Sequence, residues 1–353
     1  MSDTIIFSQE RVPIFQNKVY NSRAEAQRAA IGDIELVQCP VTGLVYNRKY
    51  IPELLIYDKN YQNEQACSRA FQRHLDNVLN IILRNISLHE RGIEIGCGKG
   101  YFLELLQAAG AKVTGYDPTY EGSNPRVIKK YFTHDTVAES PDYLILRHVL
   151  EHIPDPWTFL EQLKHICKKG TKIYIEVPCF KWILQHNSFY DIFYEHINYF
   201  TIDVLGGAFS RIIDSDKFFG GQYFYIVADL SSYDKPSKYK GDNFDKLEID
   251  VLLKSLVAKK IGGIDNNFVW GAGAKGITFT NILMQRGITV KTIIDINPAK
   301  QNKFAALTGV SIVAPDLIMN QLNAADIFIM NPLYVEEITE MISGVKSNLI
   351  TVA

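Results

Sequence analysis

Three glycines at alternate positions form the first candidate binding loop. The segment reads Ile93-Glu94-Ile95-Gly96-Cys97-Gly98-Lys99-Gly100, between a strand-like run and a helix-like run. In a strand–turn–helix unit, Gly96, Gly98 and Gly100 let the backbone turn tightly and approach a ligand closely, because no Cβ intervenes. The spacing predicts a turn that holds a nucleotide-like ligand, and the alternative is a purely structural turn.

Two carboxylates narrow the identity of that ligand. Glu94 lies near the mouth of the loop, where its charge repels a pyrophosphate but attracts the ammonium and sulfonium groups of S-adenosylmethionine (SAM). Asp117 ends the next strand-like run, 17 residues beyond Gly100, where a carboxylate can accept hydrogen bonds from both ribose hydroxyls. This combination predicts SAM as the cofactor.

A second glycine loop, Val269-Trp270-Gly271-Ala272-Gly273-Ala274-Lys275-Gly276, is followed 19 residues later by Asp295. Taken alone, the pattern suits NAD, so a nicotinamide-dependent oxidoreductase is a rival interpretation. Only about 110 residues remain for this unit, whereas a full dinucleotide fold uses two mononucleotide-binding halves. A structural turn without a ligand is the third interpretation.

An aromatic and titratable run, residues 189–200, follows the strand-like segment 173–177. Ligands bind beyond the carboxyl ends of parallel strands, so we expect this run to cover the pocket. His196 suits a general base, and Tyr194 suits a hydrogen-bond donor to a developing oxyanion. In extended backbone these two side chains share one face, so Glu195 orients His196 only if the chain kinks. Alternatively, the run packs as an aromatic lid.

Alternating strand-like and helix-like runs position these residues. After a helix at 66–86, strands are predicted at 92–95, 112–116, 143–146 and 172–177, with helices at 101–109 and 157–167. After a helix at 247–259, the alternation returns at 268–270, 276–284, 291–295, 310–313, 327–330 and 349–352. Shorter apolar runs at 35–38 and 44–46 predict strands and turns near the N-terminus.

This pattern predicts an α/β fold with three units. A small N-terminal lobe (1–65) precedes a central Rossmann-like SAM-binding domain (66–230). A polar stretch (231–242) is typical of a linker, and a second Rossmann-like domain (243–353) follows it.

Composition excludes several functional classes. The 353 residues include 37 Lys and Arg against 39 Asp and Glu, so no net field favours nucleic acid or an anionic membrane, and a small-molecule substrate is expected. The five cysteines are odd in number and scattered, as in a reducing compartment. No apolar stretch approaches the roughly 20 residues that span a bilayer. A cytoplasmic protein is expected.

The first loop and a second motif resemble class I SAM-dependent methyltransferases. The segment Arg147-His148-Val149-Leu150-Glu151-His152-Ile153-Pro154-Asp155-Pro156 matches the part that follows the fourth strand in many of these enzymes. The resemblance implies that 146–149, including His148, line the methionine end of SAM. It also implies that Thr133 to Asp135 lie near the adenine.

Residues 194–200 extend the resemblance to three-domain methyltransferases related to the sugar C-methyltransferases of bacterial deoxysugar pathways. That family commonly reads His-Glu-His before Ser-Tyr-Phe, where this chain reads Tyr194-Glu195-His196-Ile197-Asn198-Tyr199-Phe200. Of the tyrosine pair expected after the N-terminal lobe, only Tyr61 is present. The family's C-terminal domain helps to hold a nucleotide-linked ketosugar, so Gly271, Gly273 and Lys275 are the implied substrate contacts, with Lys275 near a phosphate.

No metal is expected, although the family carries zinc in its N-terminal lobe. Only Cys39 of the expected Cys-x-x-Cys pairs is present, and one thiolate does not form a tetrahedral site. His148 and His152, four residues apart, lack a third ligand at zinc spacing.

The function predicted is methyl transfer from SAM to a small molecule, namely C-methylation of a nucleotide-linked ketosugar. His196 is the predicted base, with Tyr194 or His152 as the oxyanion partner. Methylation of an oxygen or nitrogen in another metabolite, the oxidoreductase, and a SAM-sensing scaffold are the alternatives.

Overall fold

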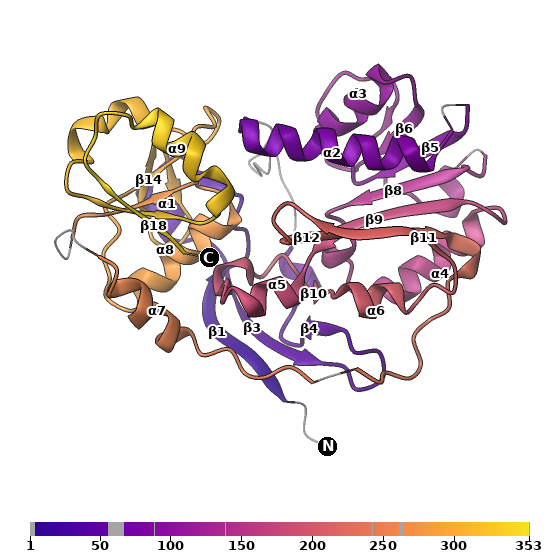
Figure 1. Ribbon diagram of the computed structural model, residues 1–353, viewed down its shortest axis with the longest axis horizontal. Coiled ribbons are helices and arrows are strands. Elements are labelled where there is room, and N and C mark those ends of the chain that lie inside the picture. Colours follow the sequence, from indigo (N-terminus) through magenta and orange to yellow (C-terminus); the bar gives the residue numbers. More distant parts are fainter. Residues whose placement is uncertain are drawn as a thin grey trace.

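The structure, a computed structural model, describes residues 4–55, 67–87, 89–137, 139–241, 243–260 and 265–352, without the side chain of Leu252. Tyr61, a predicted substrate contact, lies outside these ranges. Two seven-stranded sheets and one four-stranded sheet organise the described residues. Figure 1 shows the two large sheets side by side, with the N-terminal strands below them.

The first large sheet carries the first glycine loop. Its order is β11-β12-β9-β8-β5-β6-β7, with β5 to β9 parallel and β12 antiparallel to β9. The strands are β5 (Arg91–Ile95), β6 (Lys112–Tyr116), β7 (Val127–Ile128), β8 (Tyr143–Arg147), β9 (Lys172–Pro178), β11 (Ile212–Phe218) and β12 (Tyr223–Asp229). This Rossmann-like arrangement confirms the α/β prediction for this part of the chain.

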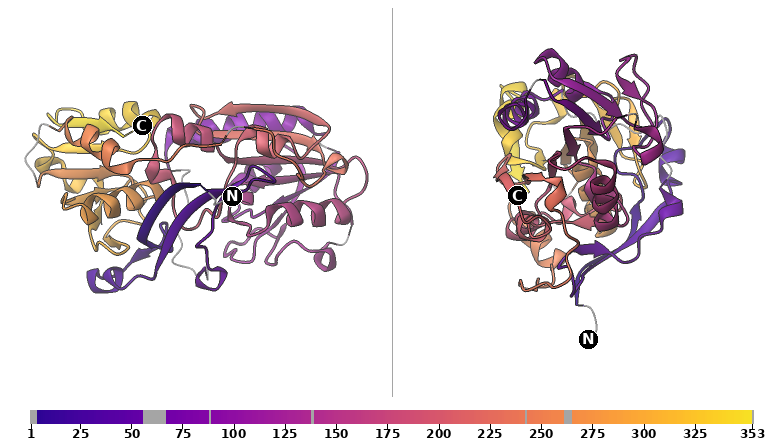
Figure 2. Two further views of the ribbon diagram at one scale, coloured as in Figure 1. Left: turned by 90° about the horizontal axis from the view of Figure 1, so that it is seen from below. Right: turned by 90° about the vertical axis from the view of Figure 1, so that its right-hand side faces the viewer.

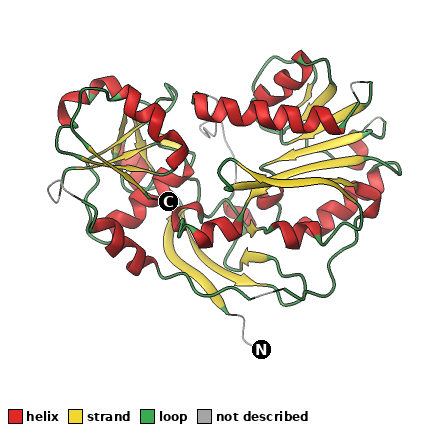
Figure 3. Ribbon diagram, in the orientation of Figure 1, coloured by secondary structure: helices red, strands yellow, loops and turns green. Residues whose placement is uncertain are grey.

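Helices cover both faces of this sheet (Figure 3). On one face lie α2 (Arg69–Asn85) and α3 (Tyr101–Ala108), whose apolar residues share a core with Val113 and Ile145. On the other face lies α4 (Pro156–Ile166), which Asp155 caps by accepting a hydrogen bond from Thr158 N. Apolar residues at helical spacing thus bury one stripe of each helix, as the sequence predicted.

The second large sheet carries the second glycine loop. Its order is β18-β17-β13-β14-β16-β15-β2, and the five strands from β18 to β16 are parallel. The strands are β13 (Asn267–Trp270), β14 (Thr292–Ile294), β15 (Lys303–Ala305), β16 (Ser311–Val313), β17 (Asp326–Ile329) and β18 (Asn348–Thr351). The helices α7 (Ile249–Val257) and α8 (Ala274–Gln285) pack on one face, and α9 (Val335–Met341) packs on the other.

The N-terminal strands join other parts of the chain. β1 (Ile5–Pro13), β3 (Ile31–Gln38) and β4 (Val45–Asn47) form a sheet with β10 (Asn198–Tyr199), whereas β2 (Val19–Tyr20) pairs with β15. Figure 2 shows the indigo strands between the two large units. The N-terminal strands therefore contact both large units, through β10 in one case and β15 in the other. The predicted domain boundaries stay predictions.

The predicted linker packs against the first unit. Tyr233 is buried, and its hydroxyl donates to Trp157 O at 2.7 Å. No described helix is long and apolar enough to cross a bilayer. The short elements are α1 (Arg23–Gln27), η1 (Pro52–Leu54), η2 (His134–Thr136), η3 (Leu150–His152), α5 (Phe180–Gln185), η4 (Phe189–Asp191), α6 (Ile202–Gly206), η5 (Leu230–Ser232), η6 (Pro315–Leu317), η7 (Met319–Gln321) and η8 (Pro332–Tyr334).

Candidate active site

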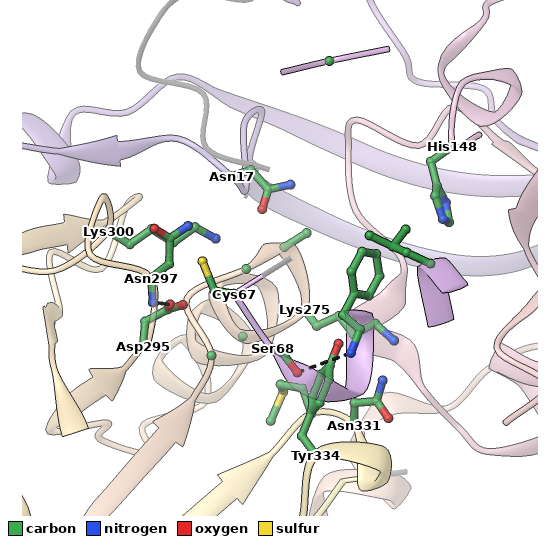
Figure 4. Close-up of a pocket in the computed structure, with 18 of the residues that line it drawn as sticks. Asn17, Cys67, Ser68, His148, Lys275, Asp295, Asn297, Lys300, Asn331 and Tyr334 are labelled. Atoms are coloured by element: carbon green, nitrogen blue, oxygen red, sulfur yellow. Dashed lines mark hydrogen bonds between the residues drawn. The ribbon is translucent and has the colours of Figure 1, made fainter. Parts of the chain in front are cut away.

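Both glycine loops line one cavity of about 380 Å³. Its walls also include the ends of β8 and β12, part of the aromatic run 189–200, and the start of α2. In the close-up of Figure 4, Asp295, Asn297 and Lys300 lie on one side of the cavity and His148 lies on the opposite side. The two ligand-binding loops that the sequence predicted separately therefore face a common space.

The first loop has the backbone that its glycines permit. Gly96 and Gly98 have φ values of 71° and 54°, and both line the cavity. A Cβ on Gly96 would lie 2.5 Å from Val149 Cγ2, whereas a Cβ on Gly98 would meet nothing within 4 Å. Gly100, with φ of 85°, begins α3 and is not among the lining residues. Two of the three glycines thus face the cavity, and the third is the N-cap residue of α3.

Asp117 supports the first loop from behind. Its Oδ2 accepts a hydrogen bond from Gly98 N at 2.9 Å, and Oδ1 accepts from Thr119 N at 2.8 Å. The side chain is buried and is not among the residues that line the cavity. The carboxylate therefore stabilises the backbone of the loop, and its predicted contact with the ribose hydroxyls stays a prediction.

Glu94 is the lining carboxylate at the end of β5. Burial raises the pKa of Glu94 to about 7, although Arg147 acts in the opposite direction. Its Oε2 has no hydrogen-bond partner within the described ranges. A cationic ligand would restore the charged form, because an opposite charge favours ionisation.

The two predicted adenine contacts lie elsewhere. Thr133 and Asp135 are exposed at η2, where Thr133 and Thr136 bond reciprocally, and neither predicted residue lines the cavity.

Glu176 organises a buried charge network beneath the cavity. Its carboxylate lies 2.9 Å from His74 Nε2, 2.9 Å from Arg147 Nε and 3.1 Å from His148 Nε2. Burial alone would raise the pKa of Glu176, but Arg147 and His148 hold it well below its usual range. The pKa of His74 is lowered by burial, despite its bond to Glu176.

His148 is a cation held between two carboxylates. Nδ1 lies 3.3 Å from Glu151 Oε1, opposite the contact of Nε2 with Glu176. Burial alone would lower the pKa of His148, but the two carboxylates raise it to about 9. The residue also has φ of 52°, which is uncommon without glycine. A protonated imidazole thus forms part of the cavity wall.

His152 and His196 lie side by side on the cavity wall, with ring centroids 4.8 Å apart. Burial lowers the pKa of His152, and it lowers the pKa of His196 well below its usual value, with His152 and His148 adding to the second effect. The Nδ1 of His152 lies 2.7 Å from Glu195 O. Because a carbonyl oxygen only accepts, this nitrogen donates, and neutral His152 has its lone pair on Nε2.

The predicted orientation of the Tyr-Glu-His run is wrong. Tyr194 and Glu195 form a turn, so the strand alternation that would align Tyr194 with His196 does not apply. The Tyr194 hydroxyl instead accepts from Ile51 N at 2.9 Å, and its ring fills the space beside Gly32. Tyr194 therefore faces the N-terminal sheet rather than the cavity.

Glu195 also faces the N-terminal segment. Its Oε2 accepts from Gln16 N at 2.9 Å, and its side chain is buried. The chain kinks here, and a kink was the condition under which Glu195 could orient His196. The Glu195 carboxylate nevertheless accepts from a backbone amide of the N-terminal segment.

The second loop has a tight β–α turn. A Cβ on Gly276 would lie 1.8 Å from Gly271 O, so this crossing requires glycine. Asp295 accepts from Ala272 N at 2.6 Å and from Asn297 N at 2.7 Å. A Cβ on Gly273 would meet nothing closer than 4.0 Å, which leaves open space in front of the N-terminus of α8.

Two lysines flank this loop, and they differ in their partners. Lys275 pairs with Asp191 Oδ1 at 2.9 Å and donates to Gln222 Oε1 at 2.8 Å, so its charge is compensated within the fold. Lys300 is 4% exposed, and its Nζ donates to Ala272 O at 3.1 Å. Burial lowers the pKa of Lys300, although Asp295 acts against this shift. Sequence reasoning selected Lys275 and missed Lys300, for which the only signal was its position after Asp295.

The histidine pair gains neighbours that sequence spacing did not indicate. Donor atoms of Glu151, His152 and His196 lie within 4.8 Å of one another, as do those of His74, His148 and Glu176. His148 and His152, which their spacing in the sequence presented as one pair, thus fall into two separate clusters, and each has neighbours that sequence spacing did not indicate. The expectation that the protein holds no metal stays a prediction.

Comparisons with known proteins agree with this geometry. Residues 60–212 match a family described as a methyltransferase domain. The chain is 27% identical over 201 residues to the C-methyltransferase NovU of Streptomyces niveus, covering 51% of this chain and 47% of NovU. It is 29% identical over 117 residues to a ubiquinone biosynthesis O-methyltransferase of Xylella fastidiosa (strain M23), covering 28% of this chain and 46% of that protein. The chain therefore spans about half the length of these curated relatives.

Among solved structures, the N-methyltransferase NodS of Bradyrhizobium japonicum, in complex with S-adenosyl-L-homocysteine, is similar with a TM-score of 0.34 and 15% identity. The similarity covers 49% of this chain and 92% of NodS. The family match over residues 60–212, together with the loop geometry, supports a class I SAM-dependent methyltransferase domain in this part of the chain. This is an enzyme domain, and its cofactor is SAM.

Proposed function

We propose that the protein transfers a methyl group from SAM to a carbon atom of a nucleotide-linked ketosugar. The observation that carries this proposal is the single cavity lined by both glycine loops, with His152 and His196 on its wall. Such a cavity can hold a cofactor on one loop and an acceptor on the other, so that the methyl donor and the acceptor meet between them.

Two charged groups of the cavity support this orientation. Glu94 lies at the first loop and suits the ammonium and sulfonium of SAM, whereas Lys300 lies at the second loop and suits an anion. The N-terminus of α8 adds a partial positive charge beside Lys300. We therefore assign the phosphate-bearing part of the acceptor to Gly271, Gly273 and Lys300, and we withdraw Lys275 from direct phosphate contact.

His196 is the proposed base. It removes a proton from the carbon next to the ketone, and the resulting enolate carbon attacks the methyl group while the carbon–sulfur bond of SAM breaks. The enolate charge cancels the sulfonium charge, and His196 then releases its proton to water. Neutral His152 offers an acceptor at Nε2, so we replace its predicted role as oxyanion donor by that of a second proton acceptor.

The same base could deprotonate a hydroxyl, as the similarity to an O-methyltransferase suggests. The experiment incubates the protein with a nucleoside-diphosphate ketosugar and SAM carrying a ¹³C-methyl group. A new methyl signal coupled to a sugar carbon is expected in the product NMR spectrum. A methoxy signal, or no transfer combined with tight binding of NADH, would refute the proposal.

His196→Ala tests the base. We expect turnover to fall by about 10²- to 10⁴-fold with little change in the binding of SAM. The matched control is His165→Ala, since the His165 side chain is 73% exposed on α4. Unchanged turnover in His196→Ala would remove this residue from the chemistry.

A further inference from the structure

Glu151 is a buried carboxylate to which the mechanism above gives no role. It belongs to η3, is 1% exposed, and neither of its oxygens makes an aligned hydrogen bond within the described part of the chain. Its Oε1 lies 3.3 Å from His148 Nδ1 and 3.9 Å from His196 Nε2. Because an uncompensated buried carboxylate is costly, a second cation near Glu151 would be strongly favoured.

The surrounding charges leave Glu151 incompletely compensated. The cation His148 is shared with Glu176, which also binds Arg147. Lys275 is already paired with Asp191. The titratable and charged groups around Glu151 and His196 on the neighbouring elements are Arg147, His148, His152, Glu176, Asp191, Tyr223 and Lys275.

Hydrogen bonds to backbone atoms on both sides of His196 hold this residue opposite Glu151. Ile197 N donates to Glu151 O at 2.9 Å, and Asn198 Nδ2 donates to Ile153 O at 2.6 Å. Together with the bond from His152 to Glu195 O, these contacts tie η3 to the residues on both sides of His196. The approach of His196 to Glu151 is thus fixed by the backbone on each side.

We propose that Glu151 is the positioning residue of His196: its carboxylate keeps the proton of neutral His196 on Nε2 and compensates the imidazolium that forms when Nδ1 takes a proton. A neutral imidazole with hydrogen on Nε2 has its lone pair on Nδ1, which then acts as the base. When Nδ1 accepts the acceptor's proton, the charge of the ring rises by one, and the present gap of 3.9 Å can close to a hydrogen bond. This inference rests on the proposed function.

The test compares Glu151→Gln, which removes the charge at nearly constant volume, with Glu161→Gln, a half-exposed control on α4. In ¹⁵N-histidine NMR of the full-length protein, wild-type His196 should be the Nε2–H tautomer, with its signals assigned through His196→Ala. In Glu151→Gln we expect mixed tautomers and a pKa lower by one unit or more, since an opposite charge at this distance shifts a pKa by roughly 1–3 units.

With the nucleoside-diphosphate ketosugar, kcat should fall about 10²-fold in Glu151→Gln while the KM values for SAM and ketosugar stay within about threefold. Glu151→Asp should restore part of the loss, and Glu161→Gln should behave as wild type. Unchanged tautomer and kcat in Glu151→Gln would overturn the inference. So would a stoichiometric divalent metal that is lost in this variant, because the carboxylate would then be a metal ligand. Undiminished turnover in His196→Ala would instead refute the proposed base itself.

Discussion

Because the pKa of Glu94 is raised, we predict that SAM affinity depends on pH. The pKa of Glu94 is about 7, chiefly because of burial, so about half of the molecules should carry a neutral carboxyl at neutral pH. SAM brings positive charge, which favours the carboxylate and lowers its pKa in the complex. Binding below pH 7 therefore releases a proton, and affinity should decline up to tenfold for each unit of acidification.

The magnitude follows from the ionised fraction. With a pKa of about 7, roughly 9% of Glu94 is charged at pH 6 and roughly 91% at pH 8, so the Kd for SAM should be about tenfold higher at pH 6. Isothermal titration calorimetry at both pH values, in two buffers of different ionisation enthalpy, measures both the Kd and the proton release.

Glu94→Gln is the matched variant, because it cannot titrate. It should bind SAM more weakly at pH 8 and lose the Glu94 contribution to the pH dependence, whereas titration of the SAM amino group is common to both proteins. If wild type and Glu94→Gln show the same ratio of Kd values between pH 6 and pH 8, Glu94 does not sense the cofactor and the electrostatic argument for SAM fails.

Three further predictions concern the loops and the metal. Asp117→Ala should weaken SAM binding by about 10- to 100-fold, since it removes the acceptor of Gly98 N; calorimetry showing unchanged affinity would remove Asp117 from the site. Gly273→Val fits the backbone φ of −83° but fills the space beside Lys300, so the KM for the ketosugar should rise at least tenfold with SAM affinity intact; an unaltered KM would show that the acceptor binds elsewhere. Elemental analysis of the dialysed protein should find no stoichiometric zinc, and a one-to-one content would contradict this.

The parts of the fold that the sequence predicts are those set by local periodicity. Alternating strand and helix patterns located the parallel strands other than the two-residue β7 to within two residues, for example β8 at Tyr143–Arg147, because strands buried on both faces are continuous apolar runs. The glycine loops were identifiable for a related reason, since a turn that lacks space for a Cβ permits few other residues. Both signals are contained within a few neighbouring positions.

The missed features depend on contacts between distant segments. β2 and β10 are two residues long, so their pairing with β15 and β4 has no periodic signal. The turn at Tyr194 was hidden by an aromatic run compatible with a strand, and its hydroxyl partner lies 143 positions away. Lys300 similarly becomes a cavity residue only because Asp295 and Asn297 turn the chain back beside the second loop. The spacing of residues along the sequence does not show which distant segments come into contact.

The positions of the charged and titratable side chains in the cavity relate the structure to the proposed reaction. Glu94 lies at the first loop and Lys300 at the second, so in the proposed complex these two groups would attract the sulfonium and the phosphate to opposite ends of the cavity. Between them, burial keeps His152 and His196 neutral, which a proton acceptor requires. Were His196 charged at rest, it would repel the sulfonium, whereas in the proposed reaction its charge arises only when the enolate forms. Because the methyl transfer that follows removes both the enolate charge and the sulfonium charge, the imidazolium then needs a partner of its own, and Glu151 is the partner that we propose.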